Sequence, residues 1–164
     1  MPSVPFSEMP DHARLWVFAA ERPLPPDAAT RLLETVDRFL EGWHAHQVPL
    51  TAARDWRDDQ FLLVAVDEQA AGVSGCSVDA LVRTMKTLGQ TLGIVLLDHA
   101  AVHSREAGAV VRRSRADFAE AAAAGAVSPE TTVFDHTVAS VGALRRGEWE
   151  RPAAASWHGR AFFA

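Results

Sequence analysis

The chain has 164 residues, of which 48 % are apolar and 23 % are charged, and its formal net charge is −5. This composition is typical of a globular domain and excludes a disordered or collagen-like chain. The negative charge argues against a general nucleic-acid-binding surface. The single cysteine excludes an intrachain disulfide and a thiolate zinc site.

Signals for membrane insertion or secretion are missing from the sequence. Apolar runs such as residues 61–66 are strand-sized and fall far short of the roughly 18 residues that a membrane-spanning helix needs. Residues 1–14 have neither the basic start nor the apolar stretch of a secretory signal. We therefore expect a cytoplasmic protein with no membrane partner.

Strand and helix patterns alternate in the first half of the chain. Residues 15–20 are apolar and rich in strand formers, and three prolines separate them from an amphipathic helix over residues 27–43, with Asp27 as its N-cap. Residues 50–57 mix polar and apolar side chains, as an edge strand does. After a short turn, residues 61–66 are apolar on both faces, which predicts a central strand of a covered sheet.

A second helix and a fourth strand complete the pattern. A glycine-containing loop over residues 67–76 leads to an amphipathic helix that Ser77 caps and Gly93 ends. Residues 94–98 are the fourth strand candidate. The order predicts an α+β fold, a ferredoxin-like βαββαβ sandwich over residues 1–104.

The C-terminal part, residues 105–164, gives weaker patterns. They predict a mixed α/β extension that packs on the core within the same structural domain. Its expected elements are two strands and two helices, at residues 110–113, 132–134, 115–124 and 138–146. Trp149 and Trp157 lie among arginines, which is typical either of a base-stacking surface or of core packing. The acidic net charge favours packing.

The loop between the third strand and the second helix is the main candidate binding site. Backbone N–H groups at such a junction attract anions. We expect the ends of strands one and three and both helix starts to share one edge of the sheet. The predicted ligand-binding residues are Glu21, Arg22, Asp67, Glu68, Ser74, Gly75, Cys76, Ser77 and Asp79. The alternative is an ordinary glycine-containing connection with a serine cap.

Two catalytic interpretations remain open beside simple binding. Cys76 precedes the predicted helix start, where the helix dipole favours a thiolate, so a thiol-dependent enzyme with Cys76 as nucleophile is the alternative function. A buried structural cysteine is the ordinary interpretation. A nucleotide phosphate loop is excluded, because the only lysine, Lys86, lies well inside the predicted helix.

Four histidines are weak candidates for metal ligands, in a His-x-His pair and a His-x-x-x-His pair. Two such pairs at one edge of the sheet could bind a metal ion. Histidine pairs are also common as plain surface residues. The four residues are His44, His46, His99 and His103.

Residues 15–18, 66–72, 74–79 and 156–158 resemble segments of an uncharacterised family of small bacterial proteins. Members of that family are often labelled "ABC transporter ATPase". The resemblance extends over nearly the whole chain and implies no established activity, cofactor or catalytic residue. The phosphate loop with its lysine that the label requires is missing here.

These observations together predict a non-catalytic cytoplasmic protein that binds a small anionic ligand or a protein partner. We expect a homodimer, because the fourth strand is more apolar than an uncovered edge strand should be. We expect no cofactor and no nucleic-acid partner.

Overall fold

The computed structural model describes residues 4–45, 47–69, 75–96 and 100–164. The chain divides into two units, which we call unit 1 (Met1–Asp98 with Ala139–Gly142) and unit 2 (His99–Val138 with Ala143–Ala164). Both contain antiparallel sheets and helices, which confirms the α+β class. Residue 104, at which the predicted core ends, lies inside a strand of unit 2.

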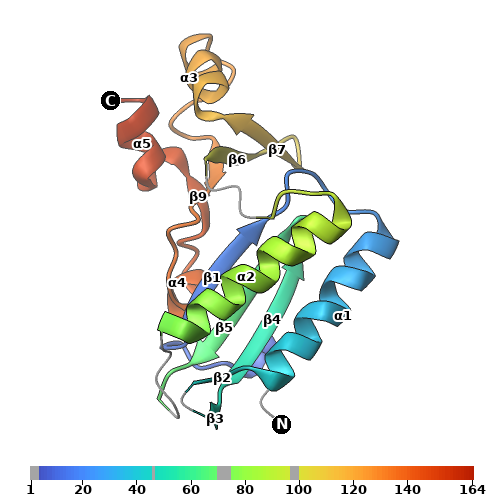
Figure 1. The fold of residues 1–164 in the computed structure, drawn as a ribbon. Coiled ribbons are helices and arrows are strands. Elements are labelled where there is room, and N and C mark those ends of the chain that lie inside the picture. Colours follow the sequence, from blue (N-terminus) through green and yellow to red (C-terminus); the bar gives the residue numbers. More distant parts are fainter. Residues whose placement is uncertain (1–3, 46, 70–74, 97–99) are drawn as a thin grey trace. The chain divides into compact units, whose positions relative to one another are not determined.

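Unit 1 is built on a three-stranded antiparallel sheet of strands β1 (Arg14–Ala19), β4 (Thr51–Arg57) and β5 (Phe61–Asp67) (Figure 1). The strand order is β1-β5-β4. The three predicted strands are therefore confirmed, with β5 in the centre and β4 at an edge. Two further short strands, β2 (His44–Ala45) and β3 (Val48–Pro49), form a separate ribbon.

The pairing of β1 with β5 fixes where their ends lie. Ala19 at the end of β1 pairs with Phe61 at the start of β5, and Arg14 pairs with Val66. The C-terminal ends of the two strands therefore lie at opposite ends of the sheet, measured along the strand direction.

Two helices, α1 (Pro26–Gly42) and α2 (Gly75–Leu92), cover one face of this sheet (Figure 1). The apolar stripe of each helix packs against alternate strand residues, because an amphipathic helix buries one side and a strand every second residue. The centre of this core includes Leu32, Val36, Leu40, Leu62, Val64, Val66, Leu81 and Met85. The N-cap of α1 is Pro25, so Asp27 lies in the first turn and does not cap the helix as predicted.

Strand β1 and the residues just after it donate backbone hydrogen bonds to two distant segments of unit 1. Leu15 N–H donates to the Ala139 carbonyl at 3.0 Å, and Glu21 N–H donates to the Val95 carbonyl at 3.1 Å. Residues 94–96 do not form the predicted fourth strand, and residues 97 and 98 lie outside the described residues.

Unit 2 contains a four-stranded antiparallel sheet with the order β7-β6-β8-β9. Its strands are β6 (Ala101–Glu106), β7 (Ala109–Ser114), β8 (Thr132–Phe134) and β9 (Glu150–Pro152). The predictions at residues 110–113 and 132–134 are confirmed, whereas β6 and β9 were not predicted.

Short helices complete the structure, and two of them pack in the core of unit 2. The helices are η1 (Phe6–Glu8), α3 (Arg115–Ala123), α4 (Val141–Arg145), η2 (Ala153–Ala155) and α5 (Trp157–Phe162). Phe118 on α3 is fully buried at the centre of an apolar cluster with Val102 and Val133 from the sheet. Phe162 on α5 packs against the same cluster.

The turn between β6 and β7 suggests a stabilising substitution. Ala107 and Gly108 both have positive φ, at 51° and 81°, as the two central residues of a type I′ turn do. Alanine is strained there, whereas asparagine tolerates this region. We expect Ala107→Asn to raise the free energy of unfolding of unit 2 by about 0.5–1 kcal/mol in urea titrations. Ala109→Asn, one residue into β7, is the control and should give no increase.

Candidate functional site

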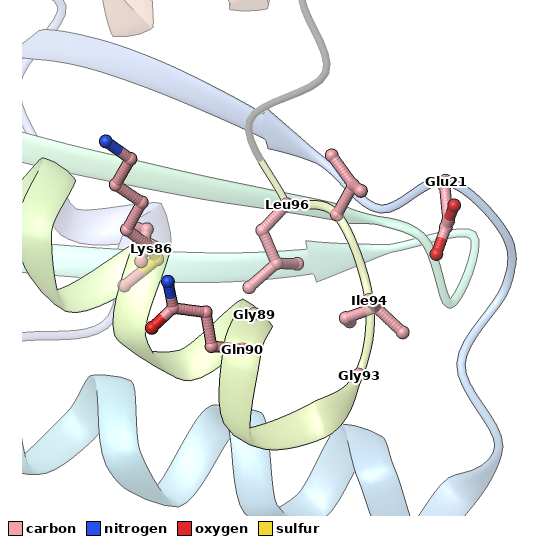
Figure 2. A pocket seen from close by; sticks show the side chains of 9 residues that line it. Glu21, Lys86, Gly89, Gln90, Gly93, Ile94 and Leu96 are labelled. Atoms are coloured by element: carbon pink, nitrogen blue, oxygen red, sulfur yellow. The ribbon is translucent and has the colours of Figure 1, made fainter.

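A cavity of about 400 Å³ in unit 1 lies beside the C-terminal half of α2. Figure 2 shows it between α2 and the segment over residues 93–96, with Lys86 and Glu21 at opposite ends. The lining residues are Glu21, Met85, Lys86, Gly89, Gln90, Gly93, Ile94, Val95 and Leu96. We call this cavity the α2 pocket.

Two glycines shape the α2 pocket. Gly93 has a φ of 68°, and this left-handed conformation ends the helix and turns the chain back. Ile94 N–H then donates to the Gly89 carbonyl at 2.9 Å. A Cβ atom on Gly89 would lie only 2.8 Å from the Ile94 carbonyl oxygen. The returning segment can therefore approach α2 this closely only because residue 89 has no side chain.

The lining of the α2 pocket is apolar in the middle and carries a charged side chain at each end. Met85, Ile94 and Leu96 are buried and provide the apolar wall. Glu21 forms an ion pair with Arg22 at 2.9 Å, so its carboxylate is already neutralised. Lys86 is exposed, and no ion pair to it is found among the described residues. The pocket can therefore bury an apolar body and bind an acidic group at Lys86.

Comparisons with protein-family models, with curated proteins and with solved structures gave no match to this chain. Its function must therefore be argued from its own geometry. No helix among the described residues is long and apolar enough to cross a membrane.

The structure does not bring the predicted ligand-binding residues together at one edge. Glu21 and Arg22 follow the C-terminal end of β1, whereas Asp67 and Glu68 lie at the C-terminal end of β5. The two strand termini lie at opposite ends of the sheet because neighbouring antiparallel strands run in opposite directions. The prediction of a single shared edge is therefore wrong.

The Asp67 end of the sheet has basic neighbours that the sequence patterns did not indicate. Asp67 accepts a hydrogen bond from Gln69 N–H at 2.9 Å, and its Oδ1 lies 3.0 Å from His12 Nε2. These two interactions, with the Gln69 bond the larger, lower the pKa of the Asp67 carboxyl. Glu68 lies 3.5 Å from the Arg14 guanidinium. Both carboxylates are thus satisfied within the chain.

The start of α2 differs from the predicted serine cap. The helix begins at Gly75, so Ser77 lies within it and is buried. The Ser77 hydroxyl donates to the His44 carbonyl at 2.9 Å, and the Ser77 carbonyl accepts from Trp43 Nε1 at 3.0 Å. Ser77 therefore fastens the helix to β2 and does not face a ligand.

Three more predicted site residues, Ser74, Cys76 and Asp79, belong to this junction between β5 and α2. Asp79 is exposed on α2. Ser74 and the Cys76 side chain lie outside the described part of the chain. The anion-binding loop and the thiol-dependent enzyme thus stay predictions.

The histidines proposed as metal ligands do not form a described metal site. His44 is exposed, and its Nδ1 lies 2.9 Å from the Gly42 carbonyl. His103 is fully buried in β6 of unit 2. His46 and His99 lie outside the described residues. Among the residues that the structure describes, no three His, Cys, Asp or Glu side chains are grouped to hold a metal ion.

Unit 2 contains a chain of three hydrogen-bonded rings that the sequence analysis did not anticipate, in which His103 and Trp149 are buried and His136 is half-buried. Trp149 Nε1 can only donate, and it lies 3.1 Å from His136 Nδ1, which is therefore the acceptor. The proton of neutral His136 is then on Nε2, 3.0 Å from His103 Nδ1. The three rings thus fix each other's tautomers. Trp149 is only 3 % exposed, so it belongs to the core and not to a base-stacking surface.

A buried ion pair lies beside these rings. Asp135 is almost completely buried and accepts from Arg151 Nη2 at 2.8 Å and from the Thr137 hydroxyl. Burial alone would raise the pKa of the Asp135 carboxyl, but the hydrogen bonds from Thr137 and Arg151 together outweigh it and hold the pKa below its usual range. The Asp135 carboxylate therefore stays charged inside the unit and orders the segment after β8.

Proposed function

We propose that this chain is a non-catalytic binding protein and that the α2 pocket binds a small amphipathic anion. The observation that carries this proposal is a cavity of about 400 Å³ with a buried apolar wall and Lys86 at its end. This volume lies within the range of small-molecule sites, which are mostly apolar with a few polar groups that orient the ligand.

The charges at the two ends of the pocket favour an anionic ligand. Glu21 is neutralised by Arg22, whereas Lys86 projects from α2 into solvent and can move toward an acidic group. Gln90, one helical turn after Lys86, adds a neutral hydrogen-bonding side chain. A ligand with an apolar body and one carboxylate or sulfonate matches this arrangement.

The probe for this site is 1-anilinonaphthalene-8-sulfonate, whose fluorescence rises when its rings leave water. We expect it to bind the folded protein, with decanoate as a competitor. The Lys86→Gln variant loses one exposed charge contact, which contributes about 1 kcal/mol. We therefore expect it to bind the probe about fivefold more weakly. Arg83→Gln is the matched control, because Arg83 is exposed on the same helix and does not line this pocket.

The single lysine allows a second measurement that needs no mutation. Lys86 carries the only side-chain amine, so acylation of it is read directly as a mass change on one peptide. We expect saturating decanoate to slow acylation of Lys86 and to leave the terminal amine unaffected. Equal probe affinity in wild type and Lys86→Gln, or equal acylation with and without decanoate, would contradict the proposal.

For the fold of unit 1 we further propose a variant of the ferredoxin-like sandwich. The order β1-β5-β4, with a helix after β1 and another after β5, supports this assignment. The hydrogen bond from Glu21 N–H to the Val95 carbonyl supports a place for residues 94–96 beside the end of β1. The relationship to the uncharacterised bacterial family is likewise a proposal, carried by the sequence resemblance alone.

A further inference from the structure

Unit 2 has a cavity of its own, with a volume of about 250 Å³. We call it the α5 pocket, because two of its lining residues come from α5. It is lined by Ala101, Arg115, Phe134, His136, Thr137, Trp157 and His158. Phe134 and Ala101 are buried and give it an apolar wall. Two polar groups on this lining determine what it can bind.

The first group is His158, which is only 1 % exposed and lines the pocket. Ser156 Oγ lies 3.0 Å from the Ala153 carbonyl oxygen, which can only accept, so we assign the single hydroxyl proton to that hydrogen bond. With this assignment, the proton between Ser156 Oγ and His158 Nδ1, which lie 2.7 Å apart, belongs to His158. Nε2 is left as an unprotonated acceptor.

Nothing in the described part of unit 2 uses that acceptor. Nδ1 is the ring nitrogen that Ser156 engages, and no hydrogen bond is made to Nε2. Burial lowers the pKa of His158 to about 4, so the ring is neutral at pH 7. Nε2 is not enclosed by protein atoms on all sides, so a water molecule or a ligand in the pocket can supply a donor to it.

The second group is Arg115, the first residue of α3. Its guanidinium lies over the Trp157 ring, 4.9 Å from the centroid, and it forms no ion pair with any described residue. Trp157 in turn stacks on His158, with the ring centroids 3.9 Å apart. The cation and the acceptor nitrogen are therefore held at one pocket by the same tryptophan.

We propose that the α5 pocket binds a small organic acid that carries a hydroxyl group beside its acidic group. Arg115 binds the carboxylate, and the hydroxyl donates to His158 Nε2. The body of the ligand lies against Phe134 and Ala101. His136 does not compete for the ligand, because both of its ring nitrogens are engaged by Trp149 and His103.

Mandelate and phenylacetate test this proposal on the wild-type protein, because they differ only in the hydroxyl. We expect mandelate to bind about tenfold more tightly at pH 7 in calorimetric titrations, and to shift the Trp157 indole resonance in ¹H–¹⁵N spectra. Methyl mandelate keeps the hydroxyl and loses the charge, and it should bind at least tenfold more weakly than mandelate.

Three variants show whether mandelate binds at the α5 pocket or elsewhere on the protein. Arg115→Gln should weaken mandelate binding about tenfold, whereas Arg160→Gln, an exposed charge on α5 outside the pocket, should leave it unchanged. Lys86→Gln should also leave the affinity for mandelate unchanged. The α5 pocket proposal can therefore fail or hold independently of the α2 pocket proposal. Equal affinities for mandelate and phenylacetate, or resonance shifts confined to unit 1, would overturn the inference.

Discussion

Replacing Phe118 with alanine is expected to lower the free energy of unfolding of unit 2 by about 3–5 kcal/mol. Phe118 is fully buried, and its ring centroid lies 4.8 Å from that of Phe162 and 6.2 Å from that of Phe163. Truncation removes the ring that joins α3 to α5 and leaves a cavity there. The measurement is urea unfolding followed by hydrogen exchange of peptides from β6 and α3.

Phe118→Leu is the control for this prediction. It retains most of the apolar volume, and swaps of that kind usually cost less than about 1.5 kcal/mol. If the alanine variant were no less stable than the leucine variant, Phe118 would not be central to the packing of unit 2.

Acidification from pH 6.5 to 4 is expected to destabilise unit 2 by about 3 kcal/mol through His158 alone. Burial holds the pKa of His158 at about 4, below the ordinary value of 6.5. Between these values the unfolded chain binds a proton that the folded chain does not, so stability falls as pH falls. Each unit of difference contributes about 1.4 kcal/mol. The effect is complete near pH 4.

The charged groups near His158 shift its pKa in opposite directions. Asp135 raises the pKa of His158, whereas Arg115 and Arg151 lower it in the same direction as burial. The carboxyls of Asp135 and Glu106 have pKa values below their ordinary values of 3.8 and 4.5, so their stabilising contribution falls only as the pH drops through those values and below. Between pH 6.5 and 5 the shifted pKa of His158 therefore contributes and these two carboxyls do not.

Urea titrations at pH 7, 5.5 and 4 measure this dependence. His158→Asn should be less stable than wild type at pH 7 and should lose most of the difference between pH 6.5 and 4. Identical slopes in wild type and variant would contradict the assignment to His158.

The elements that were predicted best from the sequence are those whose own apolar spacing identifies the secondary structure. Strand β5 and helix α1 have patterns that only one secondary structure satisfies, and both are confirmed. Strand β6 was missed because its buried residues His103 and Ser104 are polar, so no apolar alternation marks it. It is a strand because β7 and β8 pair with its two edges, and one-dimensional patterns do not contain that pairing.

The candidate sites were harder to predict than the fold. The prediction that the binding residues share one end of the sheet was wrong. The predicted sandwich itself requires the neighbouring strands β1 and β5 to be antiparallel, which places their C-terminal ends apart. The α2 pocket depends on the chain folding back on Gly89, and an isolated glycine inside a helical pattern was the only signal for it. The tautomer of His158 depends on a distance between two oxygens, which no sequence pattern reports.

The return of residues 139–142 to unit 1 affects how the protein can be dissected. Val141 N–H donates to the Ala13 carbonyl and Gly142 N–H to the Asp11 carbonyl, beside the bond from Leu15 to Ala139. A gene fragment that stops at residue 98 would encode β1 without these partners. Unpaired strand edges recruit other chains, so such a fragment should aggregate on expression, and cloning boundaries for unit 1 need the later segment joined to it.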